Sequence, residues 1–190
     1  MRALVTGVEG FVGRHLAASL VGKGVEVSGT YFEEEGLPGL PETLKLFPCD
    51  IRDYDRLASV LRTVGPASIY HLAAQSSAKL SFEKPRVTFE VNAVGTLNLL
   101  DAARKAGVGP KILLVSSCEV YGERDSPSEE DSPLNPVSPY GSSKASAELI
   151  AHQYHRYFNL RIVVARPFNH TGPGQSSVFA LPSFAKQIAE

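Results

Sequence analysis

Cysteine is scarce in this 190-residue sequence, and long apolar runs are absent. The two cysteines, Cys49 and Cys118, have neither the number nor the spacing of a disulfide framework or a zinc site, which favours a reducing compartment and ordinary packing roles. No apolar run approaches the roughly 20 residues that a membrane span needs, and the first ten residues predict a strand and a loop, not a signal peptide. These absences predict a cytoplasmic protein without a membrane partner.

An excess of either charge is absent too. The chain carries 19 basic and 20 acidic residues, which are interspersed, and its formal net charge is -1. Without a basic stripe, the sequence does not predict binding to nucleic acid. With 43% hydrophobic residues the chain can bury one sizeable core, so we expect a single globular domain over residues 1–190.

Short apolar segments alternate with amphipathic ones along the whole chain. The pattern predicts strands at 3–7, 25–31, 44–50, 67–74, 111–117 and 160–167, and helices at 11–24, 53–64, 85–107 and 140–158. This alternation is typical of the α/β class and predicts a Rossmann-type doubly wound parallel sheet with helices on both faces. Such sheets bind ligands at the C-terminal ends of their strands. A final helical segment stops at Glu190, which indicates a fragment.

The segment "TGVEGFVG" places Gly7, Gly10 and Gly13 between the first strand and the first helix. Gly7 permits a tight turn, Gly10 permits the close approach of a diphosphate, and Gly13 lets the helix and the strand pack closely. The helix N-terminus adds amide donors and a partial positive charge. We therefore predict a dinucleotide site here, although glycines also serve turns that bind nothing.

The end of the second strand bears on the choice of dinucleotide. An NAD site usually has an acidic residue there, whereas this sequence has Thr30, Tyr31 and Phe32. Because these residues are neutral, they would not repel a 2'-phosphate, which favours NADP(H). No adjacent arginine is present to grip that phosphate, and NAD(H) remains possible.

Two polar residues further along allow two interpretations each. Asp50 follows the third strand and either accepts a hydrogen bond from an adenine amino group or caps the next helix. Asn92 lies inside an apolar helix, where a buried amide needs either a functional role or a structural partner on a neighbouring strand. The small residues of "HLAAQS" (71–76) either let a cofactor approach the backbone or pack in the core.

Three side chains can meet at one sheet edge. Ser117 ends the fifth strand, and Tyr140 and Lys144 lie four residues apart on one face of the next helix. The ammonium of Lys144 would lower the pKa of Tyr140 from about 10, and Ser117 could hydrogen-bond a substrate oxygen as charge develops on it. The three residues predict a proton-transfer group, and a chance pair of surface residues is the alternative.

These motifs, with "CDIRD", "VNAVGTLNLL", "VSSCEVYG" and "RPFNHTGPGQ", resemble in order those of the extended short-chain dehydrogenase/reductase family of NAD(P)-dependent nucleotide-sugar epimerases, dehydratases and reductases. The resemblance implies an enzyme with Ser117, Tyr140 and Lys144 as its catalytic residues. It implies a homodimer built from the helices around 85–107 and 140–158. It also implies that the C-terminal substrate-binding segment is absent after residue 190.

The same resemblance implies two sets of binding residues. The cofactor set is Gly7, Gly10, Phe11, Val12, Gly13, Asp50, Ile51, Leu72, Ala73, Ala74, Asn92, Tyr140, Lys144 and Pro167. The substrate set is Ser117, Cys118, Glu119 and Asn169. No metal is predicted, because His152 and His155 are three residues apart without an evident third ligand.

Residues 166–175 look like the corresponding segment of GDP-4-dehydro-6-deoxy-D-mannose reductases. This implies NAD(P)H-dependent reduction of the C4 ketone of a GDP-4-dehydro-6-deoxyhexose to a GDP-6-deoxyhexose of the GDP-D-rhamnose type. Glu119 supports an alternative, because it occupies the position of the glutamate that removes the C5 proton in related 4,6-dehydratases. The alternatives are therefore GDP-mannose 4,6-dehydratase or another nucleotide-sugar epimerase/dehydratase and, in a different class, a non-catalytic cofactor-binding module.

Overall fold

The computed structural model describes residues 1–34, 37, 39–107 and 109–190. In this part of the chain six strands form one parallel sheet in the order β3-β2-β1-β4-β5-β6. The predicted Rossmann-type sheet is thus confirmed, and its topological switch point lies between β1 and β4, where such sheets bind ligands. The strands are β1 (Arg2–Thr6), β2 (Glu26–Tyr31), β3 (Lys45–Pro48), β4 (Ser68–His71), β5 (Lys111–Val115) and β6 (Arg161–Ala165).

The central strands end sooner than predicted. β4 ends at His71, not at residue 74, and β5 ends at Val115, not at residue 117. His71 pairs with Thr6, the last residue of β1, so the residues beyond it have no further β1 partner in the ladder. The residues that follow these early strand ends form the edge of the sheet where a ligand is expected.

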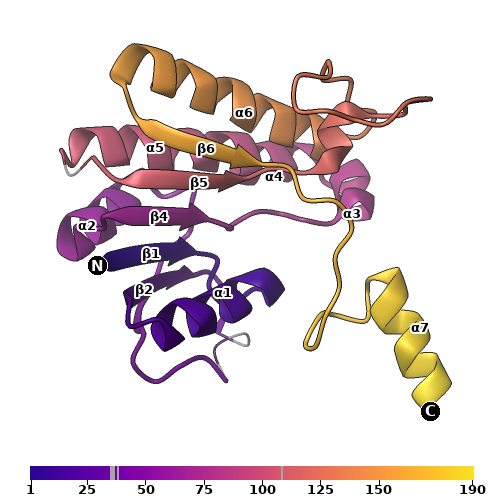
Figure 1. The fold of residues 1–190 in the computed structure, drawn as a ribbon, viewed down its shortest axis with the longest axis horizontal. Helices are drawn as coiled ribbons and strands as arrows, with labels where there is room; N and C mark the ends of the chain where they lie inside the picture. The colour runs from indigo at the N-terminus through magenta and orange to yellow at the C-terminus, as the bar shows by residue number, and fades with distance from the viewer. Residues whose placement is uncertain (35–36, 38, 108) are drawn as a thin grey trace.

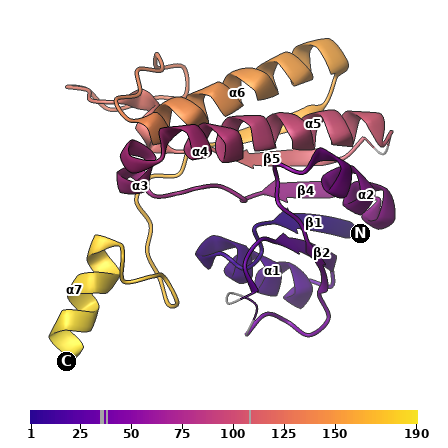
Figure 2. The same cartoon turned by 180° about the vertical axis from the view of Figure 1, so that it is seen from behind.

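Helices cover both faces of the sheet, as predicted (Figure 1). One face carries α1 (Phe11–Gly22), and the other carries α2 (Tyr54–Val64) and α5 (Gly95–Lys105), with α6 (Pro139–Phe158) beside α5 (Figure 2). Strand β1 contributes side chains to the cores on both faces of the sheet. Ala3 and Val5 pack in the core under α1, and Leu4 packs in the larger core on the opposite face. Apolar residues on both faces are the mark of a buried parallel strand.

The helix predicted over 85–107 is not one regular helix. It consists of α4 (Pro85–Phe89), a π-helical segment η2 (Glu90–Val94) and α5, which ends at Lys105. Gly95 follows the π segment, and a Cβ added there would lie 3.1 Å from Ile51 Cγ1, so glycine lets the helix approach the loop after β3. Single π turns inside helices often mark functional sites.

Two short elements were not predicted, because they are too short to show a period in the sequence. They are α3 (Ala78–Glu83) and the 3₁₀ turn η3 (Cys118–Tyr121). The helix predicted at the end of the chain is confirmed as α7 (Ala180–Ala189), which has no buried residue and lies apart from the sheet in Figure 1. No helix in the described ranges is long and apolar enough to cross a membrane.

Candidate active site

The glycine loop has the backbone that its sequence predicts. Gly7 has a φ of +68°, and a Cβ there would lie 2.8 Å from Ala73 Cα. A Cβ on Gly13 would lie 2.9 Å from Val8 Cα and would overlap the Gly7 carbonyl oxygen. Only glycine satisfies both the left-handed turn and these close approaches. The tight turn at Gly7 is confirmed, while the close approach that Gly13 permits is to the loop residues Gly7 and Val8 and not to the strand itself.

The N-terminus of α1 is open towards the same site. Its N-cap, Gly10, is extended and provides no side-chain cap, so the first amides of the helix keep their donor capacity. The next two residues, Phe11 and Val12, are half-buried and exposed respectively, with Val12 39% exposed. This end of a twelve-residue helix suits an anion such as a diphosphate.

A buried polar chain holds the other side of the loop. Thr6 Oγ1 accepts hydrogen bonds from the amides of Leu72 and Ala73, both at 3.2 Å, so its own proton goes to His71 Nδ1 at 2.8 Å. His71 Nε2 then donates to Thr96 Oγ1 at 3.1 Å, and Thr96 donates to the Asn92 carbonyl at 2.6 Å. Leu72, Ala73 and Ala74 thus follow directly on a fully paired strand end.

Burial keeps His71 neutral within this chain. It lowers the pKa of the imidazole to about 3, and the nearby Lys144 adds to the lowering. A neutral ring is required, since Nδ1 must accept while Nε2 donates. Sequence reasoning missed this role, although a histidine that ends an apolar strand was the available signal.

The hydrogen bonds of the Asn92 side chain support the structural interpretation of this residue. Its Oδ1 accepts from the Gln75 amide at 2.9 Å, and its Nδ2 donates to the Gln75 carbonyl at 3.0 Å and to Ser143 Oγ at 2.9 Å. Both Nδ2 protons are therefore used within the protein. Asn92 joins the loop after β4, the π segment and α6, and any role at the cofactor acts through that arrangement.

Asp50 does not cap the helix that follows it. The cap of α2 is Asp53, which accepts from the Arg56 amide at 3.0 Å. Asp50 instead accepts from Arg52, with Nη2 at 2.6 Å, and this contact lowers the pKa of the carboxyl. Its neighbour Ile51 is buried against Gly95. The predicted contact of Asp50 with adenine stays a prediction.

Ser117, Tyr140 and Lys144 meet at the C-terminal edge of β5. Tyr140 is buried, and burial raises the pKa of its phenol while the hydrogen bond with Ser117 lowers it. Lys144 is buried as well, and its Nζ donates to the Val115 carbonyl at 2.8 Å. The lysine lies over the last residue of β5, two residues before Ser117. The predicted convergence of these three residues is what the fold produces.

The electrostatics differ from the sequence expectation. The net shift of the Tyr140 pKa is upward, because burial outweighs the hydrogen bond with Ser117. Burial also lowers the pKa of Lys144 to about 8, although Glu148 acts in the opposite direction. The predicted lowering of the tyrosine pKa is therefore not met in this geometry. The site holds a phenol whose pKa is raised and, one helical turn further along α6, a buried amine whose pKa is lowered to about 8.

Glu119 is tied to the start of α6. Its Oε2 accepts from Ser138 Oγ at 2.8 Å, while the same hydroxyl accepts from the Gly141 amide at 2.9 Å and so caps the helix that carries Tyr140. A Cβ on Gly141 would lie 2.8 Å from the Glu119 carbonyl oxygen, so glycine allows η3 to pack on this turn. Sequence reasoning missed Ser138, whose signal was a serine followed by proline at a helix start.

The remaining predicted residues lie in η3 and in the loop after β6. Cys118 is half-buried, and its amide donates to the Pro167 carbonyl at 3.0 Å, which joins η3 to the loop after β6. Asn169 is exposed in that loop. The loop folds back onto α1, where His170 stacks on Phe11 with ring centroids 6.2 Å apart. The segment after β6 thus runs from Cys118 to Phe11 at the start of α1.

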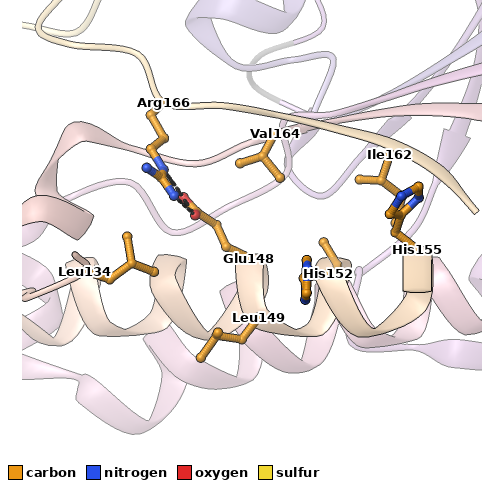
Figure 3. A pocket seen from close by; sticks show the side chains of 9 residues that line it. Leu134, Glu148, Leu149, His152, His155, Ile162, Val164 and Arg166 are labelled. Atoms are coloured by element: carbon orange, nitrogen blue, oxygen red, sulfur yellow. Dashed lines mark hydrogen bonds and ion pairs between the residues drawn. The ribbon is translucent and has the colours of Figure 1, made fainter. Parts of the chain in front are cut away.

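The two histidines of α6 lie elsewhere. His152 and His155 line a cavity of about 310 Å³ between α6 and β6, together with the ion pair of Glu148 and Arg166 (Figure 3). His155 Nδ1 bonds to the Leu160 carbonyl at 2.8 Å. Among the described residues no three potential ligands gather around a metal position. This cavity is separate from the edge that carries Ser117 and Tyr140.

Comparison with known proteins places this geometry in a family. A family model described as GDP-mannose 4,6 dehydratase matches residues 4–190. GDP-6-deoxy-D-mannose reductase of Pseudomonas aeruginosa is 37% identical over 191 residues, which cover 99% of this chain and 58% of the relative. Human GDP-mannose 4,6 dehydratase is 34% identical over 204 residues, which cover 99% of this chain and 55% of the relative.

Solved structures agree with the sequence matches. The dTDP-glucose 4,6-dehydratase DesIV of Streptomyces venezuelae, with NAD bound, gives a TM-score of 0.90 at 37% identity over 100% of this chain and 62% of its own. The UDP-glucose 4-epimerase of Thermus thermophilus in complex with NAD gives 0.86 at 37% identity over 93% and 58%. The chain spans less than two thirds of the length of these four proteins. It belongs to the GDP-mannose 4,6-dehydratase family, within the extended short-chain dehydrogenases/reductases.

Proposed function

We propose that this chain is the dinucleotide-binding and catalytic part of an oxidoreductase that reduces the C4 ketone of a GDP-4-dehydro-6-deoxyhexose to a GDP-6-deoxyhexose of the GDP-D-rhamnose type. The observation that carries the proposal is the meeting of Ser117, Tyr140 and Lys144 at the strand edge beside the glycine loop. The similarity to the Pseudomonas aeruginosa reductase supports the choice of reaction.

A nicotinamide dinucleotide fits the residues present. The turn at Gly7, the contact at Gly13 and the uncapped start of α1 form a cradle in which a diphosphate can approach the backbone. The small Ala73 and Ala74 lie on its other side, against a strand end fixed by Thr6. When bound, the dinucleotide supplies the hydride.

The chain's own residues supply the proton. Tyr140 holds a neutral phenol whose proton can pass to the ketone oxygen as C4 becomes tetrahedral, so that the product gains one hydride and one proton and the tyrosine is left as a phenolate. Ser117 orients the same oxygen and stabilises its developing charge. Lys144, with its pKa lowered to about 8, lies four residues from Tyr140 on the same face of α6, and we propose that it returns a proton to the phenolate between turnovers.

The rival reaction, dehydration of GDP-mannose, has an observation of its own. Glu119 lies in η3 next to Cys118 and Ser117, and Ser138 holds its carboxylate in place. A positioned carboxylate at this edge could remove the C5 proton that water elimination requires. The human dehydratase matches at nearly the same identity as the reductase, 34% against 37%.

A homodimer is part of the proposal. Apolar side chains are exposed on the helices predicted to form it, including Val94 on η2, Leu97 on α5 and Leu149 on α6, with Leu149 62% exposed. Exposed apolar residues gathered on adjacent helices suit a subunit interface. Analytical ultracentrifugation of the protein would show a dimer if this face is the interface, and a monomer at all concentrations would contradict it. A cytoplasmic location stays a prediction from composition.

Two parallel assays test the function. The protein is incubated with GDP-4-dehydro-6-deoxymannose plus NADH or NADPH, and separately with GDP-mannose plus NAD⁺ or NADP⁺, and products are identified by mass and NMR. Cofactor oxidation that Tyr140→Phe abolishes and Glu119→Gln spares supports the reductase. Loss of water from GDP-mannose without net cofactor change, abolished by Glu119→Gln, establishes the dehydratase instead. Dinucleotide binding with neither reaction would indicate the non-catalytic module.

A further inference from the structure

A carboxylate lies at the end of β2, although the strand itself ends in neutral residues. It comes from the glycine loop, where Glu9 Oε1 accepts a hydrogen bond from the Phe32 amide at 2.8 Å. The other oxygen of Glu9, Oε2, is buried and has no hydrogen-bond partner among the described residues. A buried carboxylate oxygen without a donor is costly, and a ligand hydroxyl would satisfy it.

The packing of the loop on β2 fixes this position. The Val8 amide donates to the Thr30 carbonyl at 3.0 Å, so the loop is hydrogen-bonded to the end of the strand. Val8 is buried over Gly29, where an added Cβ would lie 2.8 Å from Val8 Cβ. Glycine in β2 therefore lets Val8 sit against the strand, and the next residue, Glu9, reaches Phe32.

We propose that Glu9 determines the cofactor specificity of this site. Its carboxylate accepts hydrogen bonds from the adenine-ribose hydroxyls and so selects NAD(H) over NADP(H). The inference rests on the proposed function, since it assumes that a nicotinamide dinucleotide binds across the switch point. In dinucleotide sites of this fold an acidic residue at the second strand holds the ribose. Here the acid reaches the same place from the first loop, and Thr30, Tyr31 and Phe32 no longer indicate NADP(H).

The sequence shows no arginine adjacent to the end of β2, but the structure brings Arg14 of α1 near this site, and its positive charge acts against the selectivity that Glu9 provides. Arg14 Nη2 donates to the backbone carbonyl of Glu9 at 3.3 Å, and Nη1 lies 3.8 Å from the position a Cβ would take on Gly39. The guanidinium is thus close enough to the loop to attract a 2'-phosphate. That phosphate carries close to two negative charges, however, and it would have to share its site with the Glu9 carboxylate. The proposal is that the carboxylate decides the preference.

The test measures dissociation constants for NADH and NADPH by cofactor fluorescence, without any sugar nucleotide. Adenosine 5'-monophosphate and adenosine 2',5'-bisphosphate serve as a second pair that differs only in the 2'-phosphate. The variants are Glu9→Gln, which keeps the oxygen that bonds Phe32 and removes the charge, and Glu33→Gln, which removes an exposed carboxylate just beyond β2. Glu9→Ala is a second variant, and the thermal unfolding of each protein shows whether it is folded.

We expect the wild type to bind NADH at least about tenfold more tightly than NADPH, which is about 1.4 kcal/mol. Glu9→Gln and Glu9→Ala should reduce that ratio by about tenfold or more, with the same trend in the adenosine pair, while Glu33→Gln leaves it unchanged. A wild type that prefers NADPH, or a ratio that Glu9→Gln does not change, would overturn the inference and leave the proposed function intact. Failure of both dinucleotides to bind would overturn both.

Discussion

The two halves of the candidate site treat their polar groups differently. Behind the glycine loop, the side chains of Thr6, His71, Thr96 and Asn92 bond to one another and to the backbone, and each is buried. At the end of β5, by contrast, the buried Ser116 hydroxyl has no hydrogen-bond partner among the described residues. The difference separates a scaffold behind the loop, whose polar groups are satisfied internally, from the proposed reacting edge at the end of β5. In the glycine loop itself, Glu9 Oε2 has no partner among the described residues either, so both ends of the proposed site keep hydrogen-bonding capacity.

The largest effect should come from the reacting edge. Tyr140→Phe removes the proposed proton donor while keeping the buried ring, so turnover should fall about 100- to 10,000-fold with little change in stability. Steady-state cofactor oxidation measures it. Tyr157→Phe is the matched control, because Tyr157 lies on the same helix and is 76% exposed. Equal losses in the two variants would show that Tyr140 has no chemical role.

The next effect belongs to the scaffold. Gly13→Ala places a methyl group against the Val8 backbone, which must move, so we expect a loss of about 1 to 3 kcal/mol in unfolding free energy and weaker dinucleotide binding. Gly22→Ala is the control in the same helix, since its added methyl group meets nothing within 4 Å. Denaturant unfolding and cofactor titration measure both. A Gly13→Ala protein as stable as Gly22→Ala would contradict the close contact.

The paired scaffold also predicts a pH dependence of stability. The pKa of His71 is lowered from 6.5 to about 3, so below pH 6.5 the unfolded chain binds a proton that the folded chain does not. Stability should therefore fall as the pH decreases, by up to about 1.36 kcal/mol per pH unit. Between pH 6.5 and 5.5, most carboxylates do not titrate. We expect urea unfolding between pH 6.5 and 5.5 to show this dependence of the unfolding free energy on pH in the wild type and not in His71→Gln. The same pH dependence in both proteins would mean that other groups cause it.

The smallest effect tests the contact that joins helix α6 to Glu119. Ser138→Ala and Asp53→Ala each remove a helix N-cap, and each should cost about 1 kcal/mol of stability. Only Ser138→Ala also releases Glu119, whose charge contributes to the raised pKa of Tyr140, so it should change the pH profile of kcat while Asp53→Ala leaves that profile unchanged. Thermal unfolding and pH-rate measurements separate the two roles. If both variants alter the profile alike, the Ser138 contact is only a cap.

The features that the sequence predicted differ in kind from those that it did not. Period and spacing predicted a doubly wound parallel sheet, the turn at Gly7 and the meeting of Tyr140 with Ser117, whereas the strand order comes from the structure. The turn at Gly7 depends on the local sequence. The meeting of Tyr140 with Ser117 follows once the strands are assigned, because parallel strands bring their C-terminal ends to one edge of the sheet. Features that depend on three-dimensional neighbours could not be predicted. Examples are the hydrogen-bond chain that fixes the tautomer of His71 and the hydrogen bond from the Phe32 amide to Glu9.

Burial was the other unpredictable quantity. The sequence led to the expectation of a lowered Tyr140 pKa from the spacing of Lys144, but desolvation of the phenol reverses the direction. Likewise, the helix over 85–107 gains a π turn where the Asn92 side chain bonds outside the helix. In both cases the side chain's surroundings, and not its spacing along the chain, decide the outcome.

The most direct test of the central claim is hydride transfer itself. The protein is incubated with GDP-4-dehydro-6-deoxymannose and NADH or NADPH that carries deuterium at nicotinamide C4, each stereoisomer in turn, and the sugar product is examined by NMR. The account predicts deuterium at sugar C4 from one stereoisomer and a product that Tyr140→Phe does not form. A ketone that remains unreduced while GDP-mannose loses water in the parallel reaction would contradict it.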